Sequence, residues 1–175
     1  MIKRIRQLCK AIRAGITAED ESFINEYLTL DERKLFNTMA VYDKRHALNV
    51  AASAAELVRQ YQITVNFRLM MKAALLHDIG RTADTVILSD KILLVLLEML
   101  PPGLQHFIAK DKCYGFIGRR RQALYRCMHH AFIGAVKLRE IGALDVAAVV
   151  ERHHNKPDDN DDSELVVLRK ADEAN

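Results

Sequence analysis

Side chains that can bind metal ions lie on the apolar faces of several predicted helices, and this feature restricts the possible folds most. Four stripes with helical spacing each carry one such side chain: His46 with Val50 and Leu57, His77 with Met70 and Ala73, His153 with Val146 and Val150, and Asp172 with Leu165 and Leu168. A lone buried histidine is usually hydrogen-bonded to the backbone. Burying several imidazoles and carboxylates together is costly unless a common partner satisfies them, and a bound cation is the simplest such partner.

The same spacing predicts an all-α fold, a single-domain helical bundle with a metal site in its core. The 175 residues include only 7 Gly and 3 Pro, and no apolar run alternates as a strand would. We expect residues 1–40 to form N-terminal helices that pack on or precede the core, and residues 41–175 to form the main domain. Half of the residues are hydrophobic, which suffices for a sizeable core.

Helix-start signals divide the chain into short segments. Thr17–Asp20 and Thr29–Glu32 have the pattern of helix N-terminal boxes, and Ser89 is a predicted N-cap for a helix that ends before Pro101. Residues 113–118 are predicted to form a loop. The remaining helices are expected at about 43–60, 66–79, 119–129, 131–140, 145–153 and 163–175.

Composition argues against several partners. The net charge of +3 and the absence of tryptophan give no reason to expect DNA or RNA binding. Three cysteines without a CxxC pair favour a reducing cytoplasm, and no segment resembles a signal peptide or a membrane span. The N-terminal stripe Ile2, Ile5, Cys9 and Ile12 could lie on a membrane surface, but packing onto the domain is the favoured interpretation. The oligomeric state is left open.

Five segments, in order, resemble one known family. Ala74–Arg81 (ALLHDIGR) resembles the HDIG signature of the HD superfamily of metal-dependent phosphohydrolases. The other four resemble its remaining histidine and aspartate helices: Arg45–Ala51, His130–Ala135 (HAFIGA, an H-x-x-IGA helix), Val149–His154 and Leu168–Asn175. This resemblance covers about three quarters of the chain and implies the HD-type fold.

The resemblance also implies a ligand set. His46, His77, Asp78 and Asp172 match the residues that hold one metal ion, and His130 and His153 match the extra histidines of binuclear members, where the aspartate of the HD pair bridges both ions. His154 is a further ligand or a hydrogen-bond donor to substrate. His129 is the less favoured alternative to His130, and His106 has no motif around it.

Three departures narrow the function. A GYP tail is absent after His154, and Tyr42 stands where trinuclear members carry a glutamate, which argues against a cyclic-di-nucleotide phosphodiesterase. The residue after HDIG is Arg81 where many relatives carry lysine. A guanidinium can bind two phosphate oxygens at once. Asp78 and Arg81 are therefore the expected catalytic residues, and Arg81 is also expected to bind the substrate, with Arg45 as a weaker substrate contact.

The resemblance therefore implies hydrolysis of a phosphomonoester or phosphodiester by a metal-bound hydroxide, with a small, nucleotide-like phosphorylated substrate expected. Two divalent transition-metal ions are the expected cofactors. The mixed nitrogen and oxygen ligands favour iron or manganese, with zinc, cobalt or nickel as alternatives. Two other functions remain open: a diiron oxygenase that uses the same ligands, and a non-catalytic signalling or binding module.

Overall fold

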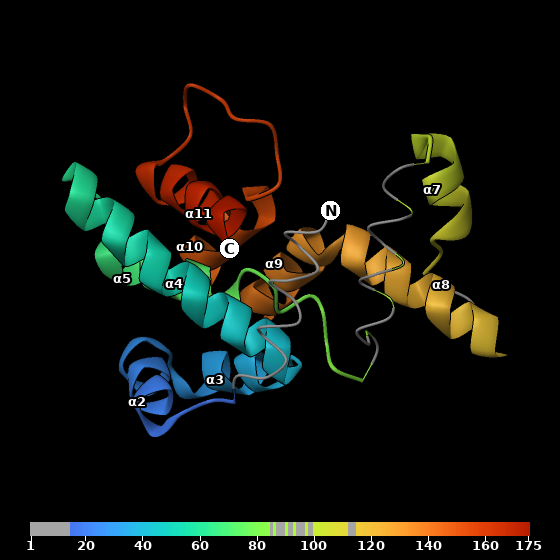
Figure 1. Cartoon of the computed structure of the whole chain (residues 1–175), viewed down its shortest axis with the longest axis horizontal. Helices are drawn as coiled ribbons and strands as arrows, with labels where there is room; N and C mark the ends of the chain where they lie inside the picture. Colours follow the sequence, from blue (N-terminus) through green and yellow to red (C-terminus); the bar gives the residue numbers. More distant parts are fainter. Residues whose placement is uncertain are drawn as a thin grey trace.

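The computed structural model describes residues 15–84, 86, 90, 93, 97, 100–111 and 115–175, and all regular secondary structure in them is helical (Figure 1). This confirms the predicted all-α fold. The predicted Ser89 cap and the N-terminal stripe lie outside the described residues. The helices are α2 (Ala18–Tyr27), α3 (Leu30–Asn37), α4 (Val41–Tyr61), α5 (Phe67–Leu76), α7 (Pro102–Ile108), α8 (Gly115–Met128), α9 (His130–Glu140), α10 (Leu144–Arg152) and α11 (Ser163–Ala174).

Two capping boxes start α2 and α3, as the sequence predicts. The Thr17 hydroxyl accepts from the Asp20 amide, and the Asp20 carboxylate accepts from the Thr17 amide. Thr29 and Glu32 repeat this exchange at the start of α3. Each cap satisfies amides that would otherwise lack partners, and such caps stabilise by about 1 kcal/mol. Both short helices pack against α5.

The core forms where α4, α5, α10 and α11 meet. α4 lies along α5 and α11, while α10 contacts both α5 and α9 (Figure 1). Small side chains on the facing sides of α4 and α5, such as Ala51, Ala54 and Ala73, are fully buried. They let the helix axes approach closely, so larger residues such as Met70 and Leu75 fill the space between neighbouring helices.

The prediction between residues 101 and 118 omits one helix and is wrong in another place. The omitted helix is α7, which begins at Pro102, a position where the missing amide is harmless. Residues 115–118 belong to α8, not to a loop, and Gly115 enters that helix with φ of 79°. Arg121 of α8 donates to the carbonyls of Phe107 and Ile108, which joins the two helices.

Figure 1 shows α7 and the far end of α8 at one side of the molecule, away from α4, α5 and α11. The described residues contain no helix long and apolar enough to cross a membrane.

Candidate metal centre

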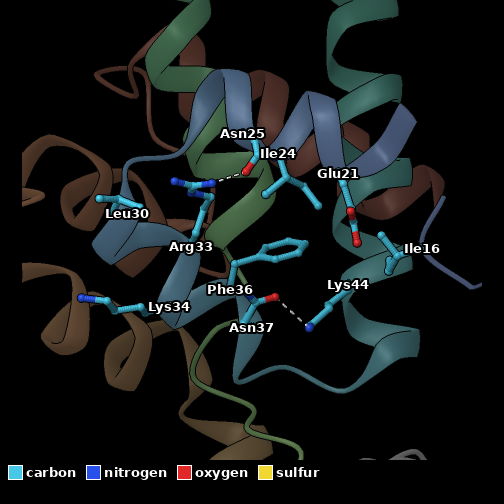
Figure 2. Close-up of a pocket in the computed structure, with 10 residues that line it drawn as sticks. All are labelled: Ile16, Glu21, Ile24, Asn25, Leu30, Arg33, Lys34, Phe36, Asn37 and Lys44. Carbon is cyan, nitrogen blue, oxygen red and sulfur yellow. Dashed lines mark hydrogen bonds between the residues drawn. The ribbon is translucent and has the colours of Figure 1, made fainter. Parts of the chain in front are cut away.

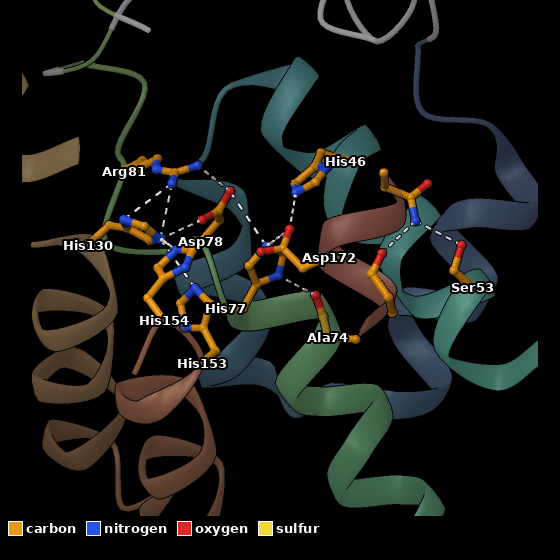
Figure 3. Close-up of polar contacts among 12 residues, drawn as sticks. His46, Ser53, Ala74, His77, Asp78, Arg81, His130, His153, His154 and Asp172 are labelled. Carbon is orange, nitrogen blue, oxygen red and sulfur yellow. Dashed lines mark hydrogen bonds and ion pairs between the residues drawn. The ribbon is translucent and has the colours of Figure 1, made fainter. Parts of the chain in front are cut away.

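Most of the candidate ligands lie at or beside helix ends, and all of them point into one region (Figure 3). His77 and His153 are the C-cap residues of α5 and α10, and His130 begins α9 directly after α8 ends. His46 comes from the first half of α4, and Asp172 from the last turn of α11. Every residue that the sequence assigned to the metal site is therefore in this cluster.

Three of the histidines share one local geometry. The Nδ1 atoms of His77, His130 and His153 lie 2.9, 2.7 and 2.6 Å from the carbonyl oxygens of the residues three positions earlier, Ala74, Cys127 and Val150. A carbonyl can only accept, so each Nδ1 carries the proton. Each Nε2 then presents a lone pair to the cluster, which is the tautomer that binds a metal ion.

One group of ligand atoms consists of His46, His77 and Asp172, whose ligand atoms all lie within 4.8 Å of one another. Oδ1 of Asp172 is 3.0 Å from Nε2 of His46 and 3.6 Å from Nε2 of His77. Burial raises the pKa of Asp172, but the hydrogen bond from His46 and the nearby His77 outweigh it and hold the pKa well below the usual range. The carboxylate is therefore ionised at neutral pH and suits a cation.

A second group consists of His130, His153 and His154, again within 4.8 Å. Nε2 of His130 lies 3.3 Å from Nε2 of His153 and 3.0 Å from Nε2 of His154. Burial is the main cause that lowers the pKa of all three, to about 4 for His130, and Arg81 adds to it for His130 and His154. These imidazoles are therefore neutral at neutral pH, as metal binding requires.

Asp78 stands between the two groups. Its Oδ1 is 3.1 Å from Nε2 of His130, and its Oδ2 is 3.6 Å from Nε2 of His77. The side chain is 1% exposed. Burial raises its pKa, but the charge of Arg81 and the neighbouring His77 hold that pKa well below the usual range. Its two oxygens therefore face different ligand groups, as a bridging carboxylate must.

Two buried atoms show that these residues fit metal ions. Nε2 of His77 and Oδ1 of Asp78 make no hydrogen bond with any described residue. An unsatisfied buried acceptor costs about 1–3 kcal/mol. Both atoms point into the cluster, so ions held by the two groups would satisfy them.

Arg81 reaches into the same region (Figure 3). Its Nη1 donates to Oδ2 of Asp78 at 2.6 Å, and its Nη2 lies 3.0 Å from Nε2 of His130. Arg45 instead pairs with Asp20 and with the carbonyl of Gly15, both near the start of α2. Substrate binding by either arginine stays a prediction.

His129 lies outside both ligand groups. The ring of His129 packs on Tyr125, with centroids 4.3 Å apart. The geometry therefore agrees with the H-x-x-IGA motif, which favours His130 over His129 as the ligand. The side chain of His106 is outside the described residues.

Close packing of two glycines seats α9 against the HDIG turn, a relationship that the sequence reasoning missed. A Cβ on Gly80 would lie 2.2 Å from the carbonyl oxygen of His130, and one on Gly134 would lie 3.3 Å from Ile79. Lys137 of α9 also donates to the carbonyl of Ile79 at 3.1 Å. The glycines of HDIG and of IGA were visible in the sequence, but their contact could not be inferred from it.

Asp43 was also missed. It is 1% exposed and lies on α4 one turn before His46. That spacing places it on the ligand face, and this signal could have identified it.

A surface hollow between α2, α3 and α4 contains none of the candidate ligands (Figure 2). Two pairs of its polar residues contact each other: Lys44 donates to Asn37 at 3.0 Å, and Arg33 donates to Asn25. Among the described residues, the two groups that could hold a metal ion both lie in the histidine cluster.

Comparison with family models matches residues 44–174 to the HD domain. The chain belongs to the HD domain family. Searches among curated proteins and among solved structures give no significant match. The HD domain match covers every candidate ligand, from His46 to Asp172, and assigns the chain to a superfamily of metal-dependent, hydrolase-type proteins.

Proposed function

We propose that this HD domain is a phosphohydrolase that holds two divalent transition-metal ions and cleaves a small phosphomonoester or phosphodiester, with a nucleotide-like substrate. One observation carries the proposal: two groups of three ligands lie on either side of a single buried carboxylate, Asp78. Two ions held by these groups would supply an acidified water and take up charge on the phosphate oxygens.

The residues of the chain divide the remaining work. Asp78, His77, His130 and His153 are almost fully buried, so they hold their positions without competition from water. His46 and Asp172 are 25% and 21% exposed, and His154 is exposed, so substrate would enter on their side. His154 completes the second ligand group or, as the alternative, donates a hydrogen bond to the phosphate, and Arg81 offers a forked cation to two phosphate oxygens.

Iron or manganese suits this donor set best, since imidazole and carboxylate ligands are mixed. Hydrolysis is the favoured reaction because Arg81 places a contact for an anion next to Asp78. Activation of dioxygen does not require such an anion contact. A non-catalytic module would have no need for six or seven converging ligands.

The test uses protein stripped with a chelator and reloaded with Mn²⁺ or Fe²⁺. We expect metal-dependent release of phosphate or alcohol from at least one member of a panel of aryl phosphates, nucleotides and cyclic nucleotides. A matched sample loaded with Fe²⁺ is exposed to oxygen and followed by absorption spectroscopy. Oxygen consumption with an organic substrate and no ester cleavage would identify an oxygenase instead. No turnover in either assay would identify a binding module.

A further inference from the structure

The guanidinium of Arg81 contacts Nε2 of His130, an atom that a second metal ion would also need. It donates to Oδ2 of Asp78 at 2.6 Å, and its Nη2 lies 3.0 Å from Nε2 of His130. That same Nε2 is the atom through which His130 faces His153 and His154. A nitrogen lone pair can serve one partner at a time, so it binds either the guanidinium or an ion.

The charges at the site lead to the same competition. Asp43, Asp78 and Asp172 place carboxylates around the cluster, and Arg81 lies among them. One divalent ion together with Arg81 would balance three carboxylates. Two divalent ions together with Arg81 would leave an excess of positive charge in a site that excludes most water, where like charges repel strongly.

Arg81 can move more easily than the ligands around it. Its side chain is 17% exposed, whereas those of Asp78 and His130 are 1% and 3% exposed. Its Nε is buried and makes no hydrogen bond with a described residue, so that part of the side chain is not held in place. A long side chain with one open flank can turn away without unfolding a helix.

We propose that Arg81 and the second metal ion exchange places. This inference rests on the proposed two-ion site. The first ion binds at His46, His77 and Asp172 while Arg81 stays on Asp78 and His130. The second ion binds at His130, His153 and His154 only when Arg81 leaves Nε2 of His130, and the released guanidinium is then available for the phosphate of the substrate. The ions therefore bind in a fixed order, and a phosphate anion favours the second.

Calorimetric titration with Zn²⁺ tests the exchange in three proteins. Arg81→Met removes the charge and keeps most of the apolar volume, while Arg139→Met removes a surface arginine from the same helix as His130 and is the control. We expect Arg81→Met to bind the second Zn²⁺ at least about tenfold more tightly than the wild type, with the first affinity unchanged. Arg139→Met should match the wild type. The exchange would be overturned if the affinity for the second Zn²⁺ stayed the same or fell in Arg81→Met. It would also be overturned if the wild type and Arg81→Met each bound a single ion.

A measurement on the wild type avoids any effect of mutation on folding. The Nε–H resonance of Arg81, assigned by its absence in Arg81→Lys, is followed by NMR during the same Zn²⁺ titration. It should shift during the second equivalent and not during the first. A shift confined to the first equivalent, or none through two, would contradict the exchange.

The two proposals can fail separately. If Arg81→Met tightens the second site and no phosphate ester is cleaved, the exchange holds and the phosphohydrolase is wrong. If esters are cleaved and the second affinity does not depend on Arg81, the reverse is true.

Discussion

Nε2 of His130 lies 3.3 Å from Nε2 of His153, and neither nitrogen carries a proton to place between them. Both rings donate their Nδ1 protons to backbone carbonyls, those of Cys127 and Val150. Two lone pairs at this distance repel unless a cation or a proton lies between them. Burial lowers the pKa of both histidines, so at neutral pH the partner that fits is a metal ion rather than a proton.

The lowered pKa of His130 predicts how the stability of the metal-stripped protein depends on pH. Burial, with Arg81, lowers that pKa from 6.5 to about 4. Below pH 6.5 the unfolded chain therefore binds a proton that the folded chain does not, and the free energy of unfolding falls as the pH falls toward 4. For a shift of this size the loss from His130 alone is roughly 3 kcal/mol.

Urea unfolding in the presence of a chelator at several pH values between 7 and 4 measures this effect. His130→Gln should reduce the slope in that range, because glutamine does not titrate. His129→Gln is the control, since His129 lies outside both ligand groups. An equal slope in wild type and His130→Gln would show that His130 is not buried in its neutral form.

The number of bound ions is a second prediction. Metal analysis of protein loaded with Mn²⁺ should approach two ions per chain, one for each ligand group. His153→Ala should bind the second ion much more weakly, because the second group loses one of its three imidazoles and keeps only His130 and His154 beside the shared Asp78. His129→Ala should still bind two. One ion in the wild type after replenishment would mean that His130 and His153 serve another purpose.

Replacing the carboxylate between the two groups is a third prediction. Asp78→Asn keeps the shape of the side chain but has one acceptor oxygen and no charge, so it cannot bridge two ions. We expect hydrolysis to fall by at least about a hundredfold and metal occupancy to fall with it. The stripped protein should stay folded, because apolar residues make the core.

Asp159→Asn, in the exposed loop before α11, is the matched control and should behave as the wild type. Thermal melting with and without Mn²⁺ gives an independent readout: the metal-dependent rise in melting temperature should shrink in Asp78→Asn, since a ligand stabilises only the state that binds it. Two ions and near-normal activity in Asp78→Asn would remove the central assignment of this site.

Local sequence signals predicted much of the fold. The capping boxes at Thr17 and Thr29 depend on residues three positions apart, so the sequence contains all that is needed to find them. The helix at Pro102 was missed because Pro-Pro-Gly is compatible with a helix end and with a helix start, and only the tertiary packing of α7 on α8 selects the start.

The metal cluster was predicted for a different reason. Ligands on apolar helix faces must converge wherever those faces pack together, and the family resemblance gave their order. The position of Arg81 could not be predicted this way. Whether its guanidinium points to solvent or to Asp78 and His130 depends on distances between α5 and α9, and no sequence spacing encodes them.

The contact between Gly80 and His130 gives the last prediction. A Cβ at position 80 would lie 2.2 Å from the carbonyl oxygen and 2.7 Å from the Cα of His130, and both are backbone atoms that cannot turn aside. Gly80→Ala must therefore push the start of α9 away from the HDIG turn. His130 would move with it, so the second ligand group should lose its ion while His46, His77 and Asp172 keep theirs. Gly103→Ala, where a Cβ would meet no atom of the described residues within 4 Å, is the control. Metal analysis should give one ion per chain in Gly80→Ala and two in Gly103→Ala, and thermal melting of the stripped proteins should show Gly80→Ala destabilised, since forced overpacking costs about 1–3 kcal/mol. Full metal occupancy with an unchanged melting temperature in Gly80→Ala would mean that α9 is not held by this contact.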